Sequence, residues 1–177
     1  MTLQERVTML FDFFKNRKRT IYDRTGKIPY LVRWYIFLKD RKSFPFNITL
    51  HKVLVSDEPV LHDHPWSWGA FIIKGGYWEH IPIISKEGAV VGSTKEWRGP
   101  GSFRFRKAND LHWLELAKDE DGNEIPCWSL FYMGKKEKEW GFVRPVLAKD
   151  VAGWKDAGYR WISHQEYLKD REKNEYA

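Results

Sequence analysis

Cysteine is almost absent from this sequence of 177 residues, which contains only Cys127. A single cysteine excludes an intramolecular disulfide and fits a reducing compartment. Cys127 lies in the apolar run I-P-C-W-S-L-F-Y, which favours a packed core thiol over a nucleophile. The sequence also lacks any apolar run of the roughly 18–20 residues needed to span a bilayer.

A secretory signal pattern is missing as well, because Glu5 and Asp12 interrupt the first residues and no small-residue cleavage site follows. We therefore expect a cytoplasmic protein with no membrane partner. Long basic runs do not occur either. The net charge is +6, but Lys and Arg alternate with Asp and Glu throughout, which favours a solvated basic surface over a nucleic-acid interface.

Aromatic residues, in contrast, are abundant, with ten Trp, eight Tyr and eleven Phe. This composition suits β-structure with a large ring-lined interior, and the length suits one domain. Alternation and turn residues predict a strand that carries the histidines at 62 and 64 and eight further short strands, at residues 29–38, 46–55, 68–74, 77–84, 101–106, 111–116, 125–133 and 140–143. The predicted fold class is an all-β barrel or sandwich with terminal helices.

The N-terminal helix is predicted by the capping box Thr2-x-x-Glu5 and by apolar residues at helical spacing up to about Phe14 or Asn16. We expect its apolar stripe to lie on the rest of the domain. The basic segment 15–20 that follows is interpreted as a solvated exit from the helix.

Three connecting segments complete the prediction. Gly75-Gly76 predicts a tight hairpin turn between its two flanking strands. Residues 86–99 are polar and are interpreted as a loop or ragged hairpin. After Pro145 the pattern changes to helix or loop, with a second capping-box candidate at Ser163.

The strongest chemical signal is the sequence L-H-D-H-P-W-S-W, which carries His62 and His64. Side chains two apart on a strand share a face, so both imidazoles would project the same way and Asp63 would turn away. His112, on a second strand, could supply a third imidazole. Three converging imidazoles make a site for a divalent transition metal with positions open to water or substrate.

These motifs resemble those of the cupin superfamily, which forms a double-stranded β-helix, or jelly-roll barrel. The first cupin motif, G-x5-H-x-H-x3–4-E-x6-G, is matched at His62, His64 and Gly75-Gly76, without its glutamate. The second runs from Gly101 to His112 at the expected spacing, with changes inside it. The resemblance implies a single domain with an N-terminal helix and linker at 1–27, a barrel at 28–144 and a C-terminal cap at 145–177.

A closer resemblance covers nearly the whole chain, through strings such as Y-L-V-R-W, H-D-H-P-W, G-G-Y-W-E and L-H-W-L-E-L. These strings are similar to a group of small phage and bacterial cupins that has no assigned reaction. The resemblance implies that Glu79, in G-G-Y-W-E, belongs to the pattern and takes the place of the missing motif glutamate. A metal ligand or acid/base role for Glu79 and a structural ion-pair role are equally supported. The resemblance also implies a homodimer.

The leading functional hypothesis is a metal-dependent enzyme that acts on a small molecule, either an oxygenase or an isomerase or hydrolase. His62, His64 and His112 would hold Fe(II), with Mn, Ni or Zn as alternatives, and Glu79 would be a fourth ligand or a catalytic base. The alternative is a non-catalytic metal- or ligand-binding barrel, or a structural accessory protein of a phage.

Further polar and aromatic residues have two interpretations each. Arg33 and Arg104 could bind an anionic substrate, although surface arginines are the favoured interpretation. His51 is interpreted as a satisfied core histidine or a support for the metal site. Trp66 and Trp68 could stack on a ring-bearing ligand, but core packing is the commoner role of Trp in a barrel.

Overall fold

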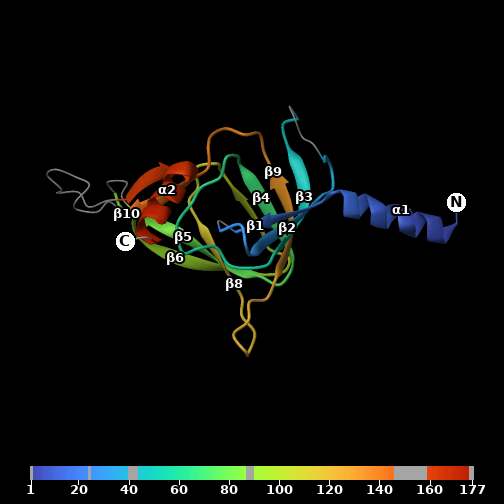
Figure 1. Cartoon of the computed structure of the whole chain (residues 1–177). Helices are drawn as coiled ribbons and strands as arrows, with labels where there is room; N and C mark the ends of the chain where they lie inside the picture. Colours follow the sequence, from blue (N-terminus) through green and yellow to red (C-terminus); the bar gives the residue numbers. More distant parts are fainter. Residues whose placement is uncertain (1, 24, 40–43, 87–89, 146–158, 176–177) are drawn as a thin grey trace.

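The computed structural model describes residues 2–23, 25–39, 44–86, 90–145 and 159–175. The elements in chain order are α1 (Leu3–Asn16), β1 (Lys18–Tyr22), β2 (Pro29–Tyr35), β3 (Asn47–Val53), β4 (Trp68–Lys74), β5 (Tyr77–Ile84), β6 (Val90–Arg98), β7 (Phe103–Arg106), β8 (Trp113–Leu116), β9 (Cys127–Met133), β10 (Gly141–Pro145), β11 (Tyr159–Ser163) and α2 (His164–Glu175). Strands dominate, and the two helices lie at the ends of the chain (Figure 1). The predicted all-β, single-domain jelly-roll class with terminal helices is therefore confirmed.

The barrel wall consists of two antiparallel sheets. One has six strands in the order β1-β2-β3-β9-β4-β7, and the other has three in the order β6-β5-β8. The apolar core between them contains buried side chains from both sheets, namely Leu31, Val53, Ile72, Tyr77, Leu116 and Cys127. Because the sheets enclose this interior, inward-pointing side chains far apart in sequence meet there.

Strand β3 illustrates how the sequence selects the inner face. Its side chains alternate between buried and half-buried positions along all seven residues, as the two-residue period of a strand requires. Thr49, His51 and Val53 share the buried face. The inner face of β3 therefore contributes polar side chains, Thr49 and His51, to the barrel interior as well as the apolar Val53.

The turn at Gly75-Gly76 has a different role from the predicted one. Strand β4 pairs with β7 and β9, whereas β5 pairs with β6 and β8, so the expected β4–β5 hairpin is wrong. The two glycines instead carry the chain from one sheet to the other. Gly75 has φ of 76°, and a Cβ atom there would lie 2.5 Å from the carbonyl oxygen of Pro126. Position 75 therefore needs glycine for two reasons, the positive φ angle and the close approach of the Pro126 backbone.

Two predicted loops are strands in the structure. Residues 90–98 form β6, which pairs along β5 with a register shift near its far end, in place of the expected loop or ragged hairpin. Residues 18–22 form β1, which pairs with β2, in place of a solvated basic exit. Both strands lie at the edge of their sheets. Edge strands carry many polar side chains that face solvent, so the apolar alternation that predicts a strand is weak in these two segments.

Helix α1 has the predicted bounds and capping box, with Thr2 Oγ1 accepting from the Glu5 N–H at 3.2 Å. Its predicted packing is wrong. The helix projects away from the barrel (Figure 1), and those of its apolar side chains that the structure describes are exposed, for example Leu3 at 79% and Val7 at 58%. Arg17 anchors the end of the helix by donating a hydrogen bond to the Tyr35 carbonyl oxygen at 3.2 Å.

The C-terminal part contains β11, which pairs with β10, and α2. The predicted cap of α2 is present, because the Glu166 N–H donates to Ser163 Oγ at 3.2 Å. Residues 146–158, which we interpreted as helix or loop, lie outside the described residues. In the described part of the chain, neither helix is long and apolar enough to cross a membrane.

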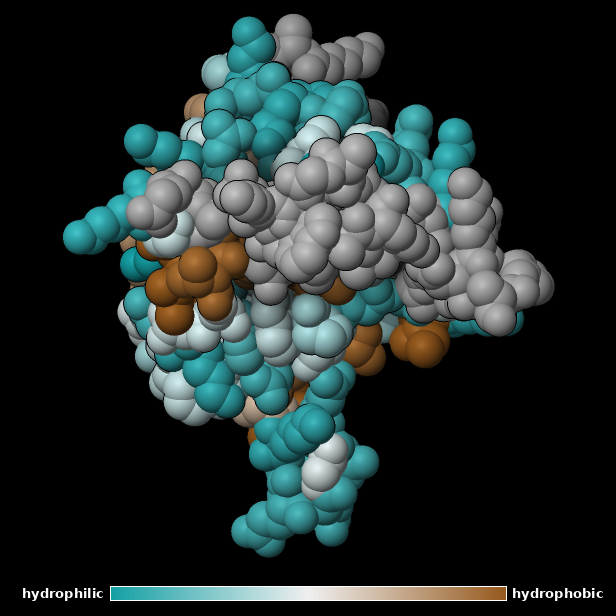
Figure 2. Space-filling view, turned by 90° about the vertical axis from the view of Figure 1, so that its left-hand side faces the viewer, coloured by the Kyte–Doolittle hydropathy of each residue, from teal (hydrophilic) through white to brown (hydrophobic). Residues whose placement is uncertain are grey.

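The segment 118–124 forms a polar hairpin tip that projects below the barrel and is hydrophilic along most of its surface (Figures 1 and 2). The bridge between Lys118 and Glu124 closes it. Gly122 at its end has φ of 83°, a conformation that glycine adopts without steric cost.

Candidate metal centre

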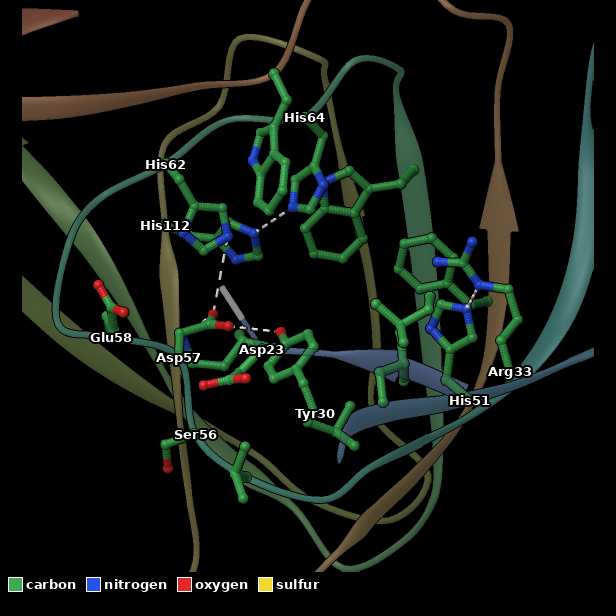
Figure 3. Close-up of a pocket in the computed structure, with 18 of the residues that line it drawn as sticks. Asp23, Tyr30, Arg33, His51, Ser56, Asp57, Glu58, His62, His64 and His112 are labelled. Atoms are coloured by element: carbon green, nitrogen blue, oxygen red, sulfur yellow. Dashed lines mark hydrogen bonds and ion pairs between the residues drawn. The ribbon is translucent and has the colours of Figure 1, made fainter. Parts of the chain in front are cut away.

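The backbone of the HDH segment is held by two isolated bridges rather than by a strand, because His62 pairs with His112 on one side and with Phe142 on the other. His62 and His112 lie opposite each other in an isolated antiparallel bridge, with each N–H donating to the other's carbonyl oxygen at 3.0 Å. The predicted regular strand at 62–64 is therefore wrong. The predicted side-chain directions are nevertheless correct. His62 and His64 point into the barrel interior (Figure 3), whereas Asp63 points away from it, towards Gly141 and Trp161.

The three imidazoles meet in the interior. His62, His64 and His112 each offer a ring nitrogen, and these three atoms lie within 4.8 Å of one another. The Nε2 atoms of His64 and His112 are 2.8 Å apart (Figure 3). Metal–imidazole bonds of about 2.0–2.1 Å place neighbouring ligand nitrogens about 3 Å apart. The cluster therefore has the donor set and spacing that fit one divalent transition metal ion.

The environment of His64 favours neutral imidazole, which is the form that binds metal. Burial lowers the pKa of His64 well below its ordinary value, and the neighbouring His112 and His62 lower it further. His62 and His112 are also buried, at 4% and 2% exposure. Three neutral ligands would leave the full charge of a bound ion uncompensated by its own ligands.

The far side of two rings is held by acceptors. The Nδ1 of His62 lies 3.2 Å from the carbonyl oxygen of Val60, and the Nδ1 of His112 lies 3.3 Å from Glu79 Oε1. An acceptor at Nδ1 places the ring proton there and leaves Nε2 with its lone pair for a metal. The orientation of both rings is therefore determined by neighbours outside the ligand cluster.

Glu79 lies behind His112 rather than among the ligand atoms. Its carboxylate is fully buried, accepts from Arg98 Nε at 3.0 Å and from Arg106 Nε at 2.9 Å, and does not belong to the ligand cluster found among the described residues. Burial would raise the pKa of Glu79, but contacts from His112 and Arg106 outweigh it and hold the pKa well below the ordinary value. The sequence left two roles open for Glu79, a metal ligand or acid/base group and a structural ion-pair partner, and this geometry favours the second.

Asp63, between the two histidines, ties the site to the C-terminal cap. Its buried carboxylate accepts the Gly141 N–H at 2.9 Å and the Trp161 Nε1–H at 2.7 Å, and it also pairs with Lys138. Gly141 is the first residue of β10, Trp161 lies on β11, and Lys138 lies just before β10. Asp63 thus packs the cap against the segment that carries His62 and His64.

Asp57 is a site residue that the sequence did not single out. Its Oδ1 accepts from Tyr30 Oη at 2.5 Å, and its Oδ2 accepts the Leu114 N–H at 2.8 Å and lies 3.8 Å from His62 Nε2. The sequence S-D-E-P directly before the histidines carried a signal only of turn chemistry. The carboxylate nevertheless faces the same interior as the imidazoles (Figure 3).

A cavity of about 650 Å³ opens beside the histidine cluster, within the size range of small-molecule sites. Much of its wall is apolar or aromatic, including Trp66 and Trp68. His51 and Arg33 also line it, and Arg33 Nε donates to His51 Nε2 at 2.9 Å. Arg33 is therefore not the surface arginine that the sequence favoured.

Arg104, the second arginine candidate, and two further polar residues lie outside the cavity wall. Arg104 Nε is 3.9 Å from the Glu79 carboxylate, so it belongs to the arginine group behind His112. Asp110 accepts the Lys107 N–H at 2.9 Å, as a turn residue does. His80 stacks on Trp113 at 3.6 Å on the opposite face of β5 from Glu79.

No protein-family model and no curated protein sequence matches this chain. Solved structures with a similar fold include the polyketide cyclase RemF from Streptomyces resistomycificus, at 16% identity over 68% of this chain and 74% of that one, with a TM-score of 0.46. A cupin superfamily protein from Desulfitobacterium hafniense is 10% identical over 59% and 77%, with a TM-score of 0.40. Oxalate decarboxylase from Bacillus subtilis is 13% identical over 71% and 29%, with a TM-score of 0.47. At these values no reaction, substrate or cofactor transfers to this chain.

Proposed function

We propose that this cupin-like barrel is a metal-dependent enzyme that acts on a small molecule. The observation that carries the proposal is the convergence of His62, His64 and His112, within 4.8 Å, at the wall of a cavity of about 650 Å³. Structural metal sites are usually closed by four protein ligands, whereas catalytic sites keep a position open. Three imidazoles beside a cavity match the second arrangement.

The ion we favour is Fe(II), with Mn, Ni or Zn as alternatives, because imidazole suits several first-row metals. When bound, such an ion would supply a Lewis-acid centre that lowers the pKa of bound water and can take up O2. Oxygenase chemistry is the reaction class that we propose first, and isomerase or hydrolase chemistry is the second.

The residues around the cluster have separate tasks in this proposal. Glu79 orients His112 through Nδ1, in place of the ligand role that the sequence also allowed. Asp57 is the candidate base, because its carboxylate is close to His62 Nε2 and is held by Tyr30. The aromatic wall keeps bulk water away from the imidazoles and strengthens these electrostatic interactions.

The test is metal content, measured by elemental analysis of the purified full chain. We expect near-stoichiometric metal in the wild type and in His80→Ala, which removes a histidine outside the cluster, and loss of metal in His62→Ala and His112→Ala. Far-UV circular dichroism establishes that all variants fold. A Co(II)-substituted sample should also show visible absorption bands that both cluster variants lose.

A wild-type protein that takes up no metal even after reconstitution would overturn the proposal. The barrel would then be better described as a non-catalytic binding module or a structural accessory protein, the alternative already raised by the sequence. Stoichiometric metal without turnover of any small molecule offered would also favour a binding role, with the histidine cluster intact.

A further inference from the structure

A polar row crosses the inner wall of the six-stranded sheet. The strand register places Arg33 on β2 opposite His51 on β3, and His51 opposite Ser129 on β9. All three side chains line the cavity. Inward polar positions on three adjacent strands are uncommon in a barrel core, because burial of polar groups costs free energy unless they are satisfied.

Arg33 is the positive charge in this row. Among the described residues, no carboxylate lies within ion-pair distance of its guanidinium. Its Nε donates to Nε2 of His51 at 2.9 Å, and this hydrogen bond adds no negative charge. Arginine stays charged in proteins, so this part of the cavity wall carries a cation that an anion could compensate.

His51 adds a directed polar group without adding charge. Burial lowers its pKa well below the ordinary value, and the nearby Arg33 lowers it further. The ring stacks on Phe131 at 4.4 Å, and its Nε2 lies 3.0 Å from Thr49 Oγ1. A neutral ring that accepts from Arg33 at Nε2 carries its proton on Nδ1. His51 thus holds the guanidinium in a fixed orientation.

Carboxylates in the cavity lie away from Arg33, towards the histidine cluster (Figure 3). Asp57 is engaged by Tyr30 and by the Leu114 N–H, and Glu58 accepts from Tyr167 Oη at 2.9 Å. These acidic groups repel an anion from their own side of the cavity. The charge pattern therefore orients an anionic ligand with its charged end at Arg33.

The cavity wall also includes apolar and aromatic side chains, namely Leu31, Val53, Ala70, Leu114, Phe131 and Trp68. Such a wall binds a hydrocarbon or ring and contributes free energy in proportion to the apolar area removed from water. Guanidinium binds carboxylate and phosphate oxygens through two parallel hydrogen bonds. The cavity therefore matches a molecule with one oxyanion group and an apolar body.

We propose that Arg33 is the anion-binding residue of this cavity and that the ligand is an organic acid, whose carboxylate or phosphate contacts Arg33 while its apolar body extends towards the histidine cluster. The inference names the substrate class of the same site and rests on the proposed function only for the statement that the reacting end lies at the histidines. Anion binding at Arg33 needs no metal.

The test uses 3-phenylpropionate, its neutral amide 3-phenylpropanamide, and benzyl phosphate as probes, titrated by calorimetry into the full chain. The variants are Arg33→Gln, Arg33→Lys and the control Arg160→Gln. Arg160 is an exposed arginine that pairs with Glu166 and does not line the cavity. Each titration is made with metal-loaded protein and with chelator-treated protein, and thermal melting establishes that every variant is folded.

At least one anion should bind the wild type at least tenfold more tightly than the amide, and Arg33→Gln should remove this preference. Arg33→Lys should keep part of it, because it retains the charge but not the planar fork, and Arg160→Gln should keep all of it. The carboxylate and phosphate probes identify which oxyanion the site takes.

Equal binding of acid and amide, or binding that Arg33→Gln leaves unchanged, would overturn the inference, as would failure of both anions to bind. Anion binding that persists after chelation while elemental analysis finds no metal would instead contradict the proposed function and leave this inference standing. Metal in the cluster without Arg33-dependent anion binding would contradict this inference and leave the proposed function standing. The two proposals therefore fail separately.

Discussion

The carboxylate of Glu79 lies 3.3 Å from Nδ1 of His112, on the side of the ring opposite the Nε2 that faces His64. One fully buried carboxylate thus links the histidine cluster to two arginines, Arg98 and Arg106. Neighbours that hold a metal-binding imidazole through its other nitrogen orient the ring and raise its basicity. The metal affinity of the cluster should therefore depend on a residue that does not itself bind the ion.

We expect Glu79→Gln to weaken metal binding by about 10- to 100-fold, the usual effect of such supporting groups. The amide keeps the shape but loses the charge that faces His112. Competition with a chromogenic chelator measures the affinity. The matched control is Glu115→Gln, which removes a carboxylate bonded to His80 on the outer face of the same sheet. Equal affinity in the wild type and Glu79→Gln would contradict the orienting role.

Glu79 should also make stability depend on acid pH. Its folded-state pKa lies well below the ordinary value of 4.5, so its contribution is fully present above that value and is lost as the pH falls further towards the folded pKa. In urea unfolding of chelator-treated protein, the stability gap between the wild type and Glu79→Gln should therefore narrow below about pH 4.5. A stability difference that stays constant from pH 7 to pH 3 would show that the charge of the Glu79 carboxylate does not contribute to stability.

Asp63→Ala should lower the free energy of unfolding by about 2–4 kcal/mol, because it leaves the Gly141 N–H and the Trp161 indole N–H without their acceptor. Chemical denaturation measures the change. Glu139→Ala is the comparison, since this exposed carboxylate pairs only with Lys136 among the described residues and its removal should cost less than about 0.5 kcal/mol. Similar values for both variants would contradict the role of Asp63 in holding the C-terminal cap.

Cys127 should be unreactive in the folded protein. The side chain is fully buried, and burial raises the pKa of its thiol to about 12, so almost no thiolate forms at neutral pH. We expect negligible labelling by a chromogenic disulfide reagent at pH 8 in native protein and one thiol per chain in denaturant. Rapid native labelling would mean that β9 opens readily or that the thiol lies elsewhere.

Removal of residues 1–16 should leave the barrel folded, with the free energy of unfolding changed by less than about 1 kcal/mol. Helix α1 projects from the barrel and those of its apolar side chains that the structure describes are exposed, so little packing is lost. Chemical denaturation of the full chain and of the deletion variant measures the change. A loss of more than about 3 kcal/mol would show that the helix contributes to the packing of the barrel.

Local patterns predicted much of the fold and the cluster. Strands β4 and β5 have the predicted bounds, because alternation and flanking glycines are properties of neighbouring residues. The shared direction of His62 and His64, and the opposite direction of Asp63, follow from the same two-residue period. The third imidazole, His112, was found through motif spacing.

Tertiary contacts decided what the local pattern left open. The pattern around Gly75-Gly76 fits a hairpin, but β5 pairs with β6 and β8 across the barrel, and only the packing of whole sheets selects those partners. The apolar stripe of α1 predicts burial, yet no element covers it within the described chain.

The same distinction applies to the charged residues of the site. The alternation of β5 places Glu79 in the interior, but Arg98 and Arg106, 19 and 27 residues further along the chain, determine that it forms ion pairs there. Arg33 becomes a cavity residue because β3 brings His51 beside it. Side-chain direction along a strand is local and can be predicted from residue types, whereas the partner that a buried charge meets depends on long-range strand pairing, which folding alone establishes.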